Sequence, residues 1–132
     1  MGQFSLVFIP FQRHFLLVCS MIANGIGNGY SGAFATYSTQ NNITANTNNS
    51  QTLATPITAM QANITSAPSA NSSVVLPVAN AGMELTLIKT GTSTVAVYGA
   101  GTNTINGSAS STMGSGSVVI YYTFSAGSWF SK

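Results

Sequence analysis

The chain has 132 residues, of which 45% are hydrophobic and only 3% are charged, whereas about 25% of the residues of ordinary soluble domains are charged. Its length suits one domain with some additional chain, and such a domain can bury a core without disulfides or metal ions. Three Lys and Arg residues and one acidic residue are too few for the phosphate contacts of nucleic-acid binding. A surface with so little charge predicts self-association.

Catalytic and metal-binding groups are equally scarce. Glu84 is the only side-chain carboxylate and aspartate is absent, so neither a carboxylate pair nor a Ser-His-Asp triad can be assembled within one chain. His14 and Cys19 are each the only residue of their kind, and with one Glu they do not predict a tetrahedral metal site. We therefore expect a protein that is not an enzyme and has no cofactor. The single cysteine excludes an intramolecular disulfide and is expected to be a buried, inert thiol, with an intermolecular disulfide or a reactive thiol as the alternatives.

Residues 1–23 are predicted to form an extended apolar arm. Two apolar runs, 4–11 and 15–23, are separated by a polar break that contains Arg13. A membrane-spanning helix needs about 20 apolar residues in one run, and a secretory signal carries its positive charge before the apolar stretch. We therefore expect no membrane span and an arm that is buried against another protein. A place in the domain core and a membrane-related role are the alternatives.

Residues 24–72 form a second segment, rich in Asn, Thr, Ser and Gly. Four glycines between residues 25 and 32 disfavour a regular helix there, so we expect extended strands and loops that pack against neighbours. The predicted assembly interface combines apolar residues of this segment with those of the arm. It consists of Phe4, Phe8, Ile9, Phe11, Phe15, Leu16, Tyr30, Phe34 and Tyr37.

Residues 73–132 carry the strand pattern of a β-domain. A short strand at 73–76 is followed by a proline, which ends it. The segments 83–89 and 94–98 alternate in polarity and are separated by a turn, which predicts a hairpin. The segment 117–124 is apolar on both faces and is therefore expected to be a central strand.

Shorter signals complete this domain. A strand at 104–105 runs into the turn dipeptide Asn-Gly at 106–107, a small-residue loop follows at 108–117, and a last strand covers 129–131. Together these signals predict an all-β fold, with an antiparallel β-sandwich or barrel in the C-terminal half. Its expected core contains Leu85, Leu87, Val95, Val97, Ile120, Tyr122 and Trp129.

The same domain contains three motifs with fixed spacing. They are Leu76-Pro77-x-Ala79-x-x-Gly82, Val95-x-Val97-x-Gly99-x-Gly101-x-x-Thr104-Ile105-Asn106-Gly107 and Gly127-x-Trp129. This pattern resembles a module of small virion proteins of tailed bacteriophages, which occurs in capsid decoration (cement) proteins and in head or tail fibre proteins. Asn103 stands where that pattern often has aspartate.

The resemblance implies a virion structural protein on the outer surface of the particle. The leading expectation is a capsid decoration protein, a homotrimer that binds the major capsid protein or another virion protein. The alternative is a head or tail fibre or other appendage module that binds a receptor or a glycan. A carbohydrate-binding module and a pilin-like filament subunit rank lower, because the acidic residues that each would use are absent.

The scarcity of titratable groups has a consequence for stability. Acid denaturation mostly reflects carboxylates that are paired in the folded state, and this chain has one such side chain. We therefore expect the stability to be nearly constant between about pH 4 and 9 and to depend little on salt.

Overall fold

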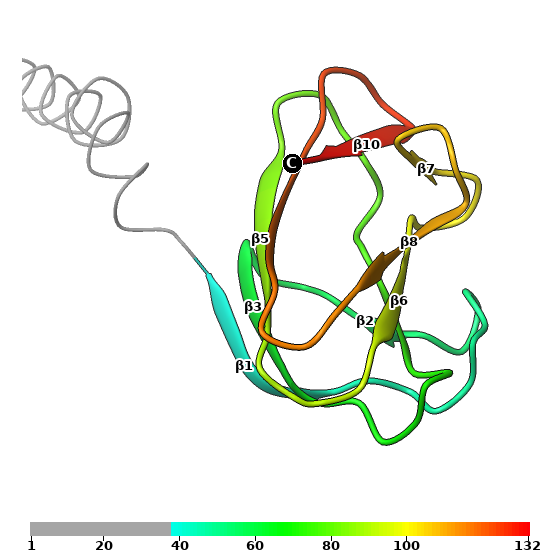
Figure 1. Cartoon of the computed structure of the whole chain (residues 1–132). Helices are drawn as coiled ribbons and strands as arrows, with labels where there is room; N and C mark the ends of the chain where they lie inside the picture. The colour runs from blue at the N-terminus through cyan, green and yellow to red at the C-terminus, as the bar shows by residue number, and fades with distance from the viewer. Residues whose placement is uncertain (1–37) are drawn as a thin grey trace, which may run out of the picture. The chain divides into compact units, whose positions relative to one another are not determined.

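The computed structural model describes residues 38–132, in which the chain alternates between two sheets (Figure 1). The six-stranded sheet has the order β1-β3-β5-β9-β10-β7, and the four-stranded sheet has the order β2-β4-β6-β8. The all-β class is thus confirmed for these residues, which contain no helix long and apolar enough to cross a membrane. The strands are β1 (Thr39–Thr44), β2 (Thr55–Pro56), β3 (Gln61–Ser66), β4 (Ser73–Val75), β5 (Glu84–Lys89), β6 (Val95–Tyr98), β7 (Thr104–Ile105), β8 (Ser110–Met113), β9 (Val118–Tyr122) and β10 (Ser128–Ser131).

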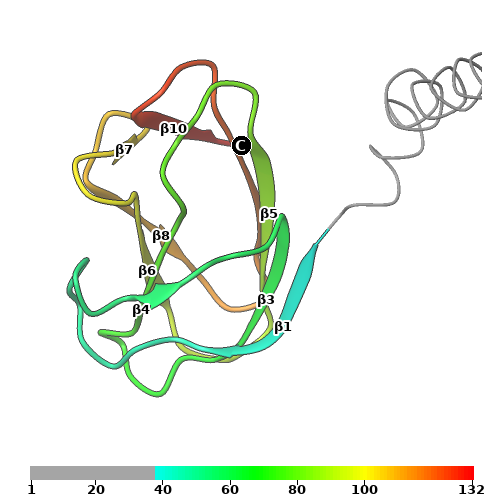
Figure 2. The same cartoon turned by 180° about the vertical axis from the view of Figure 1, so that it is seen from behind.

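The first six strands wind as a coil with parallel pairing. Strands β1, β3 and β5 lie side by side in the larger sheet, and β2, β4 and β6 lie side by side in the smaller one (Figure 1 and Figure 2). Each turn of the coil therefore adds one strand to each sheet, which is the stacking arrangement of a β-solenoid. The predicted hairpin of 83–89 with 94–98 is wrong, because β5 and β6 belong to different sheets.

The last strands reverse direction and end the coil. Strand β8 pairs antiparallel with β6, and β9 pairs antiparallel with β5. The reversal begins at the predicted Asn106-Gly107 turn, where both residues have positive φ angles of 49° and 79°, as a type I′ turn requires. Strand β8 follows this turn at residues that were predicted to be a loop. Antiparallel pairing is thus present, but only beside a parallel coil that the sequence pattern did not predict.

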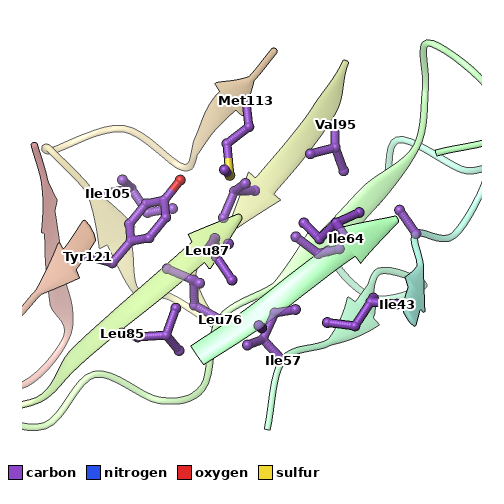
Figure 3. Packing of buried hydrophobic residues seen from close by; sticks show 14 of the residues in the cluster. Ile43, Ile57, Ile64, Leu76, Leu85, Leu87, Val95, Ile105, Met113 and Tyr121 are labelled. Carbon is purple, nitrogen blue, oxygen red and sulfur yellow. The ribbon is translucent and has the colours of Figure 1, made fainter. Parts of the chain in front are cut away.

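Apolar side chains from both sheets meet in the space between them (Figure 3). In the larger sheet, Ile43 and Ile64 occupy equivalent positions of successive coils. In the smaller sheet, Val74 and Val97 do the same. Five of the predicted core residues are buried, namely Leu85, Leu87, Val95, Val97 and Trp129.

The inward and outward faces of strand β9 are exchanged relative to the prediction. Leu85 pairs with Tyr121, so the fully buried Tyr121 points into the core while Ile120 and Tyr122 point outward. Alternation cannot assign the inward face of a strand that is apolar on both sides, because a shift of one residue exchanges the two faces. The predicted central position of this strand is confirmed, since β9 lies between β5 and β10.

The corner between β5 and β6 packs tightly on the preceding coil. A Cβ atom on Gly91 would lie 2.6 Å from the carbonyl oxygen of Thr65 and 2.7 Å from Nζ of Lys89. Gly91→Ala is therefore expected to lower the free energy of unfolding by about 1–3 kcal/mol. Gly114→Ala is the matched control, because a Cβ atom there meets nothing within 4 Å. Urea unfolding of both variants checks this, and equal midpoints would contradict the close packing of the corner.

Candidate interaction surface

The residues predicted as the assembly interface, from Phe4 to Tyr37, lie outside the described residues, as do His14 and Cys19. Within residues 38–132, no group of three or more His, Cys, Asp or Glu side chains is placed to hold a metal ion. The exposed Glu84 at the start of β5 is the one side-chain carboxylate there. The remaining candidates for a functional site are the outer surfaces of the two sheets.

The outer side of the six-stranded sheet exposes a row of apolar side chains along β9 and just beyond it. Val118, Ile120 and Phe124 are 59%, 40% and 76% exposed, and Tyr122 between them is half-buried. Alternate residues of a strand share one face, so these side chains project from the same side of the sheet. Single exposed hydrophobic residues are normal, but a contiguous row of them marks a contact site.

Three aromatic rings at one end of this row pack on one another. The ring centroids of Tyr122 and Phe124 are 5.4 Å apart in an edge-to-face arrangement, and those of Tyr122 and Phe130 are 6.0 Å apart and stacked. Phe124 and Phe130 complete the cluster at 5.7 Å. These separations lie in the favourable range for aromatic pairs, so the cluster is held in place before any partner arrives.

Ile88 of β5 widens the row, because it pairs with Val118 across the ladder. The pattern of the sequence placed Ile120 and Tyr122 in the core, and this surface was therefore missed. The available signal was the apolar character of both faces of the segment 117–124. We refer to the following residues as the outer apolar face: Ile88, Val118, Ile120, Tyr122, Phe124 and Phe130.

The same side of the sheet is polar and uncharged over β1 and β3. The Nδ2 group of Asn63 donates a hydrogen bond to Oδ1 of Asn41 (3.2 Å), and the hydroxyl of Thr90 donates to Oδ1 of Asn63 (3.1 Å). A shallow groove of about 340 Å³ lies over these strands and reaches Ile88. Its lining contains no ionisable side chain and consists of Thr39, Gln40, Asn41, Gln61, Ala62, Asn63 and Ile88.

Both exposed charged residues of the described chain border the outer apolar face. Glu84 pairs with Tyr122 across β5 and β9. Lys132 directly follows β10 and exchanges backbone hydrogen bonds of 3.1 and 3.4 Å with Ile120. Alternation places Lys132 on the same side as Phe130, and Glu84 on the outer side of β5. One negative and one positive charge therefore lie on opposite flanks of β9.

Lys89, the third charged residue of the described chain, is fully buried. Its side chain occupies the core position that Ile64 and Ile43 hold in the preceding coils. Among the described residues, Nζ has no hydrogen-bond partner, and burial lowers the pKa of Lys89 below its ordinary value. Because a buried, unpaired charge is unfavourable, we expect this lysine to reduce the stability of the folded chain at neutral pH.

The stability is therefore expected to rise with pH under alkaline conditions, which departs from the constant stability that the number of titratable groups alone predicts. Between the lowered pKa of folded Lys89 and about 10.4, the unfolded chain binds more protons than the folded chain. Burial raises the pKa of Tyr121, an effect that its hydrogen bond with Ser111 (3.1 Å) opposes. The unfolded chain loses this phenolic proton first, so the stability falls again above about pH 10. Melting temperatures should therefore peak near that pH. A melting temperature that does not rise toward pH 10 would contradict the assignment for Lys89, and one that does not fall above pH 10 would contradict the assignment for Tyr121.

Lys89→Met is expected to raise the free energy of unfolding at pH 7 by about 1–3 kcal/mol, because it keeps an unbranched side chain and removes the buried amine. Thr112→Met is the control, since it introduces the same side chain at an exposed position of β8 outside the outer apolar face, and it is expected to change the stability by less than about 0.5 kcal/mol. Chemical denaturation at pH 7 checks both variants. A Lys89→Met protein that is less stable than the wild type would show that the amine has a partner.

Comparisons with models of protein families, with curated proteins and with solved structures find no match for this chain. The function is therefore proposed from the surface and the motifs of the chain itself.

Proposed function

We propose that this chain is a structural protein that acts by binding other protein surfaces and not by catalysis. The outer apolar face carries this proposal, because it exposes aliphatic and aromatic side chains next to one another on one sheet. Apolar patches that are rimmed by polar residues mark protein–protein contact sites. The neutral amides and hydroxyls around this face lose less on desolvation than charged groups would.

The setting that we propose is the outer surface of a virus particle. There the chain serves as a capsid decoration protein, and residues 1–23 attach it to the major capsid protein or to another virion protein. The support for this setting is the resemblance of the three motifs within residues 76–129 to virion surface modules.

These motifs meet in the folded chain through hydrogen bonds. Nε1 of Trp129 donates to the carbonyl oxygen of Pro77 (3.2 Å), and the backbone N–H of Ala79 donates to Oδ1 of Asn103 (2.7 Å). The backbone N–H of Gly127 donates to the carbonyl oxygen of Ala79 (3.1 Å). The motifs are therefore elements of the fold, and asparagine at position 103 still supplies the acceptor that an aspartate would supply. The three motifs therefore support the proposal that this chain shares a structural module with virion surface proteins. They do not identify a binding site.

A fibre or other appendage module is the second candidate. The observation in its favour is the parallel coil, because solenoids extend by stacking further repeats, and β1 and β2 are the edge strands of their sheets in the described chain. A glycan-binding form of this candidate is disfavoured, since Tyr121 and Trp129 are buried in the core. Within residues 38–132 the aromatic rings that remain at least partly exposed are the cluster of Tyr122, Phe124 and Phe130 and the half-buried Tyr98.

Binding of the full-length protein to purified particles that lack it tests the proposed function. The protein is mixed with particles at increasing concentration, and the particles are sedimented. Saturable binding distributed over the capsid surface is the expected result. Labelling confined to a tail or a single vertex would favour the appendage. Protein that stays in the supernatant at every concentration would contradict a role on the particle.

A further inference from the structure

We infer that the outer apolar face binds a second copy of this chain about a two-fold axis that runs along β9. This contact between copies is independent of the proposed attachment to a particle. It follows from the apolar row on β9 and from the positions of Glu84 and Lys132 on either side of it.

The chemistry of the face suits a protein partner. The exposed row consists of aliphatic side chains at one end and an aromatic cluster at the other, and aromatic residues are enriched in the buried cores of protein interfaces. Tyr122 is held between Phe124 and Phe130, so little side-chain freedom is lost when a partner covers it. The packed rings therefore form an anchor at one end of the contact.

The charges select a second copy as that partner. In such a dimer the two sheets lie face to face, and rotation about an axis along β9 places the β5 flank of one copy opposite the β10 flank of the other. Glu84 of one copy therefore faces Lys132 of the partner subunit. The symmetric pair forms on the other side of the axis. The two residues differ in register by two positions of β9, which is about 7 Å along the strand. Long side chains bridge this offset between sheets packed about 10 Å apart.

The same rotation also packs the apolar row on itself. Ile120 and Tyr122 lie on β9 and therefore meet their own counterparts at the axis, as in any isologous contact. An axis perpendicular to β9 would instead place each Glu84 near its own counterpart, and like charges facing one another disfavour association. Within residues 38–132 Glu84 and Lys132 carry the only exposed charged side chains, because Lys89 is buried.

Sedimentation equilibrium of the full-length protein over a range of concentrations tests the contact. The wild type is expected to be a dimer, in place of the homotrimer that the resemblance implies. Ile120→Ser is expected to weaken association by at least about tenfold, since it places a polar group at the centre of the contact. Leu53→Ser is the matched control, because Leu53 is 55% exposed and lies outside the outer apolar face; its association should equal that of the wild type.

Charge reversal identifies the axis. Glu84→Lys and Lys132→Glu are each expected to weaken association by about 3- to 10-fold, because each brings like charges together in two symmetric places. The double variant restores opposite charges and is expected to return association to within about twofold of the wild type. Circular dichroism of every variant verifies that these exposed substitutions leave the strands intact.

Three results would overturn the inference. A wild-type monomer at all concentrations would mean that another part of the same chain covers the face. A trimer would exclude a two-fold contact as the basis of assembly. Association that is weakened by each single reversal but not restored by the double reversal would show that Glu84 and Lys132 do not pair between copies.

Discussion

Replacing Trp129 by alanine is expected to lower the free energy of unfolding by about 3–5 kcal/mol. The ring is fully buried, and its Nε1 donates a hydrogen bond to the carbonyl oxygen of Pro77 (3.2 Å). The substitution removes the largest side chain of the core and leaves that carbonyl without its donor. It also removes the side-chain hydrogen bond that links β10 to the chain segment between β4 and β5.

Far-UV circular dichroism in a urea titration is the suitable measurement, because Trp129 is the only tryptophan and its fluorescence disappears in the variant. Trp129→Phe is the control, since it keeps an aromatic ring and loses only the N–H donor and part of the volume. Its loss of stability is expected to be clearly smaller. An alanine variant with the wild-type midpoint would place the ring at the surface and restore the sugar-binding alternative.

Deletion of residues 1–20 is expected to abolish incorporation into the particle while β1 to β10 stay folded. The deleted segment contains both apolar runs, 4–11 and most of 15–23, whereas every described strand begins at Thr39 or later. Burying these apolar side chains against a partner is favourable, by about 25 cal/mol for each Å² of apolar surface removed from water. Incorporation is measured by sedimenting particles assembled with the truncated protein.

Full-length variants show whether the loss of incorporation comes from the missing apolar side chains or from the shorter chain. Phe8→Ser, Phe11→Ser and Phe15→Ser combined should reproduce the loss, whereas Gln3→Ala combined with Gln12→Ala keeps the apolar residues and should incorporate normally. Normal incorporation of the truncated protein would refute the role of residues 1–23 as the attachment arm.

The sequence predicts strands well where polarity alternates. The inward positions Leu85, Leu87, Val95 and Val97 are all confirmed as buried. The turn at 106–107 is confirmed too, because Asn-Gly accommodates the positive φ angles that a tight turn needs. These features depend on neighbours in the sequence, which is why the sequence alone predicts them.

Features that depend on distant neighbours were not predictable. The sequence of the turn after β5 is equally compatible with a hairpin and with a bend that leads into the other sheet. The close approach of Gly91 to the backbone of Thr65 in the preceding coil distinguishes the two. The strand at 61–66 carries a single large inward residue, Ile64, too weak a signal for a parallel coil. The outer apolar face was hidden for the same reason, since residues 117–124 could bury either side.

The copy number of this chain on purified particles tests the central claim most directly. Quantitative mass spectrometry against an isotope-labelled full-length standard measures its ratio to the major capsid protein. The proposed function predicts a fixed ratio that stays constant across gradient fractions and independent preparations. Absence of this chain from the particles, or a ratio that falls with each purification step, would contradict a structural role on the particle surface.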